Sequence, residues 1–203
     1  MTRTFLLLAA LLMPGVAGAN PVQTTWPVIV DEDPPPEGPL VINGCEIKPG
    51  TKCPGVDLRH ADLRLAKLNG ADLSGAKMDR VNLFGAELRG ANLSGASLRA
   101  ANLSMTQSPG LNLRDADLTG ASVAYSRLAG ADFTGANLTA ADLEAAMAPK
   151  AKFVGVTLVG ANMLEAKFYN ADFANAHLEG NSAPYAIWEG VHMENCTGCP
   201  FNW

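Results

Sequence analysis

Residues 71–95 read ADLSG-AKMDR-VNLFG-AELRG-ANLSG, which is five units of five residues, and this period decides the fold. The same frame runs from Val56 to Asn195 without an insertion or a deletion, giving 28 consecutive units. The first position of a unit is Ala in 20 of them, and the third position is Leu or Phe in 20. A five-residue repeat therefore organises the chain over this whole range.

The period of five excludes both an α-helix and a straight strand. In a helix each leucine would lie about 140° further around the axis than the one before, so no apolar face would form. In a straight strand successive leucines would point to opposite faces, because side chains alternate with a period of two. The chain must turn once per unit, and the fifth position is Gly in 13 units and Asn in three, which tolerate such a turn.

Equal segments joined by equal corners form a coil, and stacked coils share backbone hydrogen bonds at a spacing of about 4.8 Å. Typical units are Ala71–Gly75, Ala91–Gly95, Ala116–Gly120 and Ala131–Gly135. Their pattern, Ala-Asp/Asn-Leu/Phe followed by two variable positions, resembles the pentapeptide-repeat family over residues 56–195. The resemblance implies an all-β fold, a right-handed quadrilateral (square) β-helix solenoid with four units per coil. It would then have about seven coils and a length of roughly 30 Å.

The N-terminus has the order of a secretory signal. Arg3 precedes an apolar run from Phe5 to Met13, and the small residues Gly15–Ala19 follow. The run is shorter than the ~20 residues of a membrane-spanning helix. We therefore expect residues 1–19 to be a signal peptide that is cleaved after Ala19. The mature protein would have no membrane span and would be exported to the periplasm or the extracellular space, or to a lumen in a photosynthetic organism.

The remaining segments flank the repeats. Residues 20–40 are rich in proline and acid and are expected to form a flexible linker, because they cannot bury enough apolar surface to order themselves. Residues 41–55 and 196–203 are expected to cap the two ends of the coil stack.

Each cap contains two cysteines: Cys45 and Cys53 before the repeats, and Cys196 and Cys199 after them. The ends of the rod are roughly 30 Å apart, whereas a disulfide needs Cα atoms within about 7 Å. We therefore expect one disulfide in each cap. The Cys-x-x-Cys spacing also fits a redox dithiol or half a zinc site, but neither a thioredoxin-like context nor a second ligand pair accompanies it.

Two features of the third position concern the interior. Small residues followed by proline replace Leu in three units, Ser108-Pro109, Ala148-Pro149 and Ala183-Pro184, where we expect a local bulge or a bent side. Phenylalanines spaced by 20 residues should stack along one interior face; these are Phe133, Phe153 and Phe173.

No residue pattern indicates catalysis. The sequence contains no nucleophile with a base and no cofactor fingerprint, and His60, His177 and His192 are scattered without metal-ligand spacing. We expect no catalytic residue, no metal and no cofactor. The repeats hold 15 acidic and 12 basic residues, so a basic surface for nucleic acid is not expected either.

These observations predict a non-enzymatic, exported structural or protein–protein interaction module. The family resemblance implies an alternative, since some pentapeptide-repeat proteins mimic DNA and inhibit gyrase. Here the charges of the repeats are nearly balanced and the signal would direct the chain away from gyrase. An envelope redox partner that uses Cys196 and Cys199 is a further alternative.

One outer side is the candidate interaction surface. With four units per coil, the second unit of successive coils places large apolar residues at one corner or beside it, although Gly85, Ala145 and Glu165 interrupt the series. These residues are Leu65, Phe84, Met105, Tyr125, Leu164 and Tyr185. The other three sides are expected to carry few outward apolar residues. The surface would bind a protein partner or a second copy of the chain.

Overall fold

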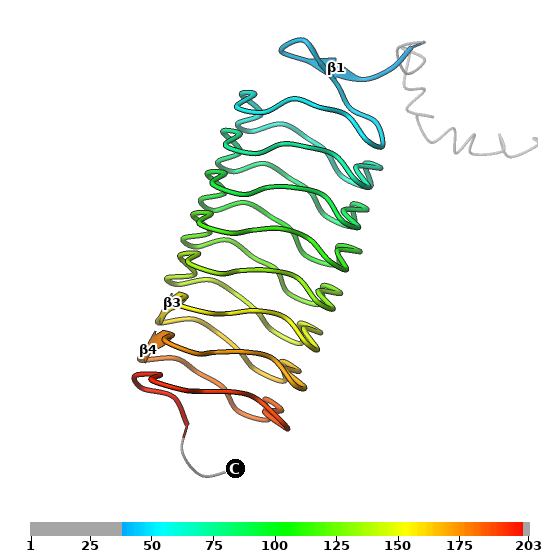
Figure 1. Ribbon diagram of the computed structural model, residues 1–203. Coiled ribbons are helices and arrows are strands. Elements are labelled where there is room, and N and C mark those ends of the chain that lie inside the picture. Colours follow the sequence, from blue (N-terminus) through cyan, green and yellow to red (C-terminus); the bar gives the residue numbers. More distant parts are fainter. Residues whose placement is uncertain (1–37, 201–203) are drawn as a thin grey trace, which may run out of the picture. The chain divides into compact units, whose positions relative to one another are not determined.

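The computed structural model describes residues 38–200, in which the chain winds into a stack of coils (Figure 1). The predictions for the signal peptide, for most of the linker and for the last three residues lie outside this range. The described residues form short strands, bridges and turns and contain no helix, so the all-β prediction is confirmed. Accordingly, no helix in residues 38–200 is long and apolar enough to cross a membrane.

Four short strands are part of this stack (Figure 1). The antiparallel pair β1 (Val41–Ile42) and β2 (Cys45–Glu46) lies in the segment before the repeats. The parallel pair β3 (Thr157–Val159) and β4 (His177–Glu179) joins two successive coils. The strands are short because each straight segment ends at a corner after a few residues.

Single parallel bridges join the other coils. They connect second positions that are 20 residues apart, as between Asn82 and Asn102. A coil therefore takes 20 residues, or four units. Coils and sides are numbered here from Val56 in chain order. In the first coil, residues 56–60 form the first side, 61–65 the second, 66–70 the third and 71–75 the fourth.

The backbone of each unit is bonded mainly to the neighbouring coils. The second-position N–H donates to the preceding coil, as from Lys77 to the Val56 carbonyl at 2.9 Å. The third-position N–H donates to the following coil, as from Met78 to the Ser97 carbonyl at 2.7 Å. The fifth-position N–H also donates to the following coil, and the first-position N–H closes the corner on the carbonyl three residues earlier.

The fourth-position N–H has no place in this ladder, and a side chain accepts it. Asp72 Oδ1 accepts the N–H of Ser74 at 3.1 Å, and Asn92 Oδ1 accepts that of Ser94 at 3.2 Å. This pairing explains why Asp and Asn recur in the second position, since a backbone donor left without a partner is costly.

The units that contain Pro109 and Pro149 form no bulge, so the expectation of a bulge is wrong there. Ser108 N–H donates to the Arg127 carbonyl and Ala148 N–H to the Lys167 carbonyl, both at 2.9 Å, as in regular units. Proline removes only the N–H that the ladder does not use. The three units with proline in the fourth position have no Asp or Asn in the second position, where they carry Gln107, Met147 and Ser182.

The interior is filled by first- and third-position side chains. Phe153 stacks between Phe133 and Phe173, with ring centroids 4.8 Å and 4.5 Å away, so the predicted phenylalanine stack is confirmed. Phe168 meets the Phe153 ring edge-on at 5.5 Å. All four rings are fully buried.

A chain of buried hydroxyl groups interrupts this apolar interior. Ser108 Oγ donates to Thr106 Oγ1 at 2.8 Å, Thr106 Oγ1 donates to Ser126 Oγ at 3.1 Å, and Ser126 Oγ donates to the Leu103 carbonyl at 2.6 Å. Every hydroxyl therefore has a partner, which makes its burial tolerable. The small third-position residue is thus compensated by polar partners in two first positions.

The regular coil begins earlier than the expected boundary at Val56. Asp72 N–H donates to the Thr51 carbonyl at 2.8 Å, and Lys52 bridges Asp72, which is the pattern of a repeat unit. The unit 51–55 was not recognised because its first position is Thr and its third is Cys53. A cysteine in the third position points inward like a leucine.

Each end of the described stack contains one disulfide. Cys45 and Cys53 are joined with Cα atoms 5.9 Å apart, and Cys196 and Cys199 with Cα atoms 5.8 Å apart. No cysteine is free. Cys45 and Cys199 are buried, so both disulfides tie cap segments onto the ends of the core.

Candidate interaction surface

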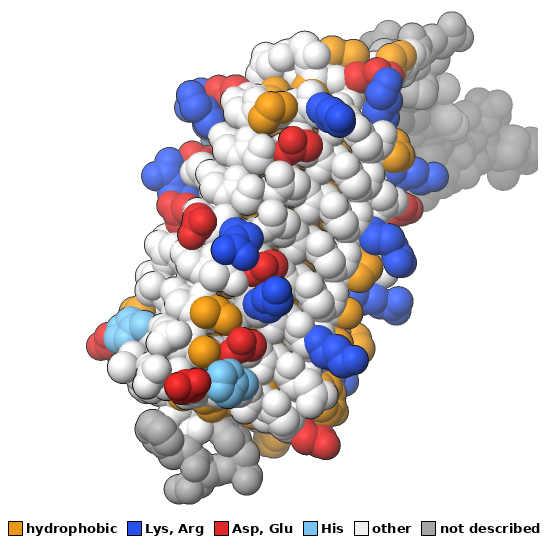
Figure 2. Space-filling view, in the orientation of Figure 1, with side chains coloured by type: hydrophobic (Ala, Val, Ile, Leu, Met, Phe, Trp, Pro, Cys, Tyr) orange, Lys and Arg blue, Asp and Glu red, His pale blue; other side chains and the backbone are white. Residues whose placement is uncertain are grey.

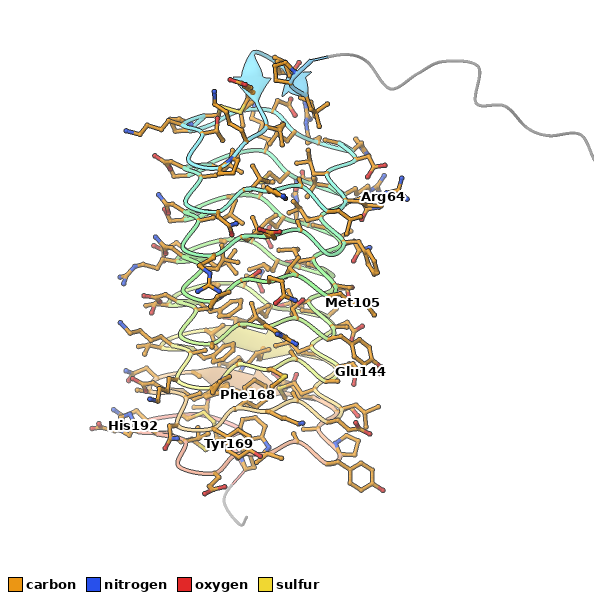
Figure 3. The ribbon with its side chains drawn as sticks, turned by 90° about the vertical axis from the view of Figure 1, so that its right-hand side faces the viewer. Arg64, Met105, Glu144, Phe168, Tyr169 and His192 are labelled. Atoms are coloured by element: carbon orange, nitrogen blue, oxygen red, sulfur yellow. A yellow bond between two sulfur atoms is a disulfide. The ribbon has the colours of Figure 1, made fainter. Side chains whose placement is uncertain are left out.

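The coil register places the six candidate residues on the second side, one coil after another. Bridges between second positions run along this side from Asp62 to Ser182. Leu65, Met105 and Tyr125 expose 70%, 48% and 52% of their surface. Phe84 and Tyr185 are also exposed, while Leu164 is half-buried. Figure 3 shows Arg64, Met105 and Glu144 one below the other along one edge of the stack.

The fifth-position members of this set have a left-handed backbone. The φ angle is 59° at Leu65, Met105 and Tyr125, and 61° at Tyr185. This conformation is unfavourable for a residue with a large side chain, whereas glycine adopts it readily. Large apolar residues therefore stand at exposed corners where glycine would be more stable.

Four of the residues form a continuous group in the first four coils, which we name the apolar corner: Leu65, Phe84, Met105 and Tyr125. Gly85 does not interrupt it, because a Cβ atom added at Gly85 would lie 2.7 Å from Leu65 Cδ2. Leu65 thus covers the neighbouring coil. Together with Asp62 and Arg64, Leu65 and Phe84 line a shallow hollow of about 430 Å³.

Acidic residues separate the apolar corner from the other two candidates. Glu144 and Glu165 lie in the fifth and sixth coils, between Tyr125 and Tyr185. The Tyr125 hydroxyl donates a hydrogen bond to Glu144 Oε1, and this bond raises the pKa of the Tyr125 phenol above its usual value. Tyr185 stands apart at the far end of the described stack.

The third side carries an apolar residue that sequence reasoning missed. Met147 is 44% exposed, and among the described repeats it is the one exposed large apolar residue outside the second side. The sequence did contain a signal, because no unit of the third side has Asp or Asn in the second position. That position holds Lys67, Glu87, Gln107, Arg127, Met147, Lys167 and Ile187.

Replacing Met105 with glycine tests the strained corner. We expect Met105→Gly to raise the free energy of unfolding by about 1 kcal/mol, because it removes a left-handed residue with a Cβ atom. Met147→Gly is the matched control, since Met147 is equally exposed but lies in an extended segment; there glycine should lower stability. Urea denaturation measures both, and a loss of stability in both variants would contradict the assignment of corners.

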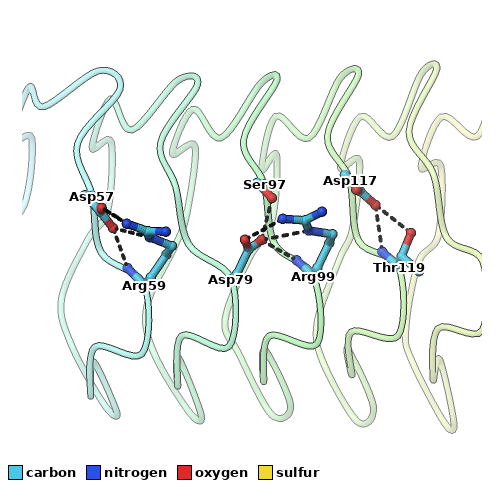
Figure 4. A network of polar contacts seen from close by, with 7 residues as sticks. All are labelled: Asp57, Arg59, Asp79, Ser97, Arg99, Asp117 and Thr119. Atoms are coloured by element: carbon cyan, nitrogen blue, oxygen red, sulfur yellow. Dashed lines mark hydrogen bonds and ion pairs between the residues drawn. The ribbon is translucent and has the colours of Figure 1, made fainter.

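Ion pairs on the first side fix several carboxylates (Figure 4). The Arg59 guanidinium donates to Asp57 and lowers the pKa of that carboxyl to about 2. Arg99 contacts Asp79 at 2.8 Å and holds the pKa of Asp79 far below its usual value. On the face shown in Figure 2, acidic and basic side chains are mixed, and basic side chains follow one another down the right-hand edge.

These lowered pKa values predict a loss of stability in acid. The carboxyls of Asp57 and Asp79 have lower pKa values in the folded protein, so they stabilise it above about pH 4 and stop doing so as the pH falls toward 2. The melting temperature should therefore fall over this range, modestly because the pairs are exposed. Asp79→Asn should show a smaller fall than the parent in thermal melts at several pH values; an unchanged pH profile would contradict this.

The structure places His177 and His192 on different sides of the stack. His177 Nδ1 lies 2.8 Å from Thr197 Oγ1, and His192 Nδ1 lies 2.9 Å from Asp172 Oδ1 on another side. Within residues 38–200 no group of three or more His, Cys, Asp or Glu side chains is placed to hold a metal ion.

Comparison with known proteins places this repeat among characterised ones. The family model described as pentapeptide repeats, in 8 copies, matches residues 50–80, 76–107, 112–146 and 150–180. A search of curated proteins found no match.

Among solved structures, the chain is similar to trypsin-treated QnrB1, a plasmid-mediated fluoroquinolone resistance protein, with 21% identity over 72% of this chain and 84% of that one, and a TM-score of 0.61. It is also similar to HetL from Nostoc sp. strain PCC 7120, with 23% identity over 70% and 82% and a TM-score of 0.35. A thylakoid lumen protein of Arabidopsis thaliana shows 30% identity over 47% and 64%, with a TM-score of 0.24. The likeness to QnrB1 shows a shared fold.

Proposed function

Because this chain belongs to the pentapeptide-repeat family, we propose that it is a non-enzymatic, exported module that binds a protein partner through the apolar corner. Proteins of this family are generally structural or interaction modules. We take the rod to have about seven coils of square section, as the resemblance implies. The apolar corner is the observation that carries the proposal.

The energetics of the corner support a binding role. Contiguous exposed apolar groups tend to mark interaction sites, and aromatic residues are frequent anchors in them. Here such side chains occupy four successive coils and, at three of them, a backbone conformation that opposes folding. Non-glycine residues with the same φ also stand at the other corners, so the exposed apolar side chains, and not the backbone conformation, distinguish this corner.

The regular backbone hydrogen bonds between the coils also support a role in partner binding. Every coil is joined to the next by three backbone hydrogen bonds in each regular unit, so the apolar corner is held in a fixed geometry before a partner arrives. Preorganised side chains lose little conformational entropy on binding. The structure of the described residues therefore favours recognition of a partner without rearrangement.

The mixed charges make the gyrase-directed alternative less favourable. A DNA mimic needs a surface of one sign, whereas Arg59, Arg64 and Arg99 neutralise acidic neighbours on the rod. The likeness to QnrB1, at 21% identity, concerns the fold. For the redox alternative, Cys199 is only 3% exposed, so access to the disulfide is limited to the half-buried Cys196.

The test compares Tyr125→Glu with Asn175→Glu in the compartment to which the protein is exported. Both positions are exposed fifth positions with φ near 59°, but Asn175 lies on the fourth side. Partner recovery should be lost in Tyr125→Glu and retained in Asn175→Glu. Equal recovery by both variants and the parent would remove the apolar corner as a binding surface. Mature protein that retains residues 1–19 and stays in the cytoplasm would refute the export part of the proposal.

A further inference from the structure

We propose that the partner of the apolar corner is a second copy of this chain, packed side by side with both rods running in the same direction. This inference rests on the proposed function, because it names the occupant of the same surface. It is carried by the charges on the two sides that meet at this corner.

The second and third sides have opposite charge. The second side has one basic residue, Arg64, and four acidic ones, Asp62, Asp142, Glu144 and Glu165. The third side has two acidic residues and five basic ones, Lys67, Arg89, Arg127, Lys150 and Lys167. The two sides therefore carry net charges of −3 and +3.

Most of these charges have no ionic partner within the described chain. On the two sides between residues 61 and 190, the one ion pair is that of Asp62 with Arg64. Lys150, Glu165 and Lys167 are in no ion pair in residues 38–200. Their charges are available to a neighbouring molecule.

A two-fold axis parallel to the rods brings these charges together. Such an axis, placed at the corner between the second and third sides, leaves each coil beside the same coil of the other copy. It turns the second side of one copy and the third side of the other toward the same groove. In the fifth coil Asp142 and Glu144 then come level with Lys150. In the sixth coil Glu165 comes level with Lys167. Because both copies have the same spacing of about 4.8 Å between coils, the coils stay level along the rod, and the opposite charges meet in the fifth and sixth coils.

An antiparallel pair matches the charges less well. A two-fold axis perpendicular to the rods sets each side against its own copy, so the basic third sides face one another. Arg127, in the fourth coil, would lie opposite the same arginine, and Asp142 and Glu144 would face a part of the second side without cations. Like charges across an interface are unfavourable.

The parallel arrangement also covers the apolar corner. Leu65, Met105 and Tyr125 lie at the corner nearest the axis, so each would contact its own copy in the partner. The exposed apolar surface is then buried between the rods, where aromatic side chains contribute most.

Sedimentation of the purified, disulfide-bonded protein tests the inference. The parent and Asn175→Glu should sediment as dimers, and Tyr125→Glu should raise the dissociation constant on the order of a hundredfold, since it places two carboxylates at the axis beside Glu144. A monomeric parent at about 100 μM overturns the inference. If Tyr125→Glu still loses partner recovery in that case, the proposed function survives with a different partner.

Charge exchange and a new cysteine test the direction of the rods. Lys167→Glu and Glu165→Lys should each weaken the dimer, and the double exchange should restore it. Leu65→Cys should form a disulfide with its own copy, while Asn175→Cys should not; all four natural cysteines are already paired. Cross-linking of Leu65→Cys with Tyr185→Cys chains, without self-linking of Leu65→Cys, would overturn the parallel arrangement.

Discussion

Leu118→Asp is expected to unfold the protein at room temperature, whereas Asp117→Leu should leave it folded. Leu118 is a third-position residue with no exposed surface, and aspartate there would bury a charge without a partner. We expect the free energy of unfolding to fall by more than about 4 kcal/mol, which is at the upper end for single substitutions. The backbone of the two neighbouring positions is equally bonded in the ladder, so the difference reports the direction of the side chains alone.

Asp117→Leu removes a smaller interaction. Asp117 Oδ1 accepts hydrogen bonds from the N–H of Thr119 at 3.1 Å and from Thr119 Oγ1 at 2.6 Å. Losing them should cost about 1 kcal/mol. Denaturant melts measure both variants, and equal losses would mean that the inward and outward positions of the unit are wrongly assigned.

Phe153→Ala should have the second largest effect. Its ring contacts those of Phe133, Phe168 and Phe173, and it has no exposed surface, so alanine would leave a cavity in the interior. Substitutions of this kind lower the free energy of unfolding by about 3–5 kcal/mol. The neighbouring coils cannot close the cavity readily because their spacing is fixed by the backbone ladder.

Phe84→Ala is the matched control for this prediction. Phe84 is 37% exposed on the second side, so its loss should change stability by about 0.5 kcal/mol or less. Thermal or urea unfolding distinguishes the two residues. If Phe153→Ala proves no more destabilising than Phe84→Ala, the phenylalanine stack is not part of the stabilising interior.

The main features of the fold could be predicted from the sequence because one period controls them. A five-residue repeat requires a turn in every unit, and this places Leu118 inward and Asp117 outward without reference to any long-range contact. The phenylalanine stack follows from the same frame once a coil takes 20 residues, as the bridges show.

Features that depend on individual hydrogen bonds could not be predicted. The prolines appeared disruptive because sequence reasoning did not identify which N–H group the ladder leaves unused. The repeat pattern does not single out Thr106 or Ser126 in the first position, and the hydrogen bond between them forms only because the coils place them one above the other.

The candidate surface was predicted in part. The repeat frame brings Leu65, Met105 and Tyr125 to one side, because the fifth position always points to a corner. It did not show that Leu65 covers Gly85, or that Met147 stands exposed on the next side. Those facts depend on the reach of single side chains, which the repeat does not determine.

A photo-activated cross-linking amino acid at Met105, with the same amino acid at Asn175 as control, tests the binding surface most directly in the compartment of the native protein. Met105 lies in the centre of the apolar corner and Asn175 on the fourth side, and both are exposed fifth positions. We predict a covalent protein adduct from position 105 and none from position 175. Absence of an adduct at 105, or the same adduct from both positions, would contradict the proposal that this corner binds a protein.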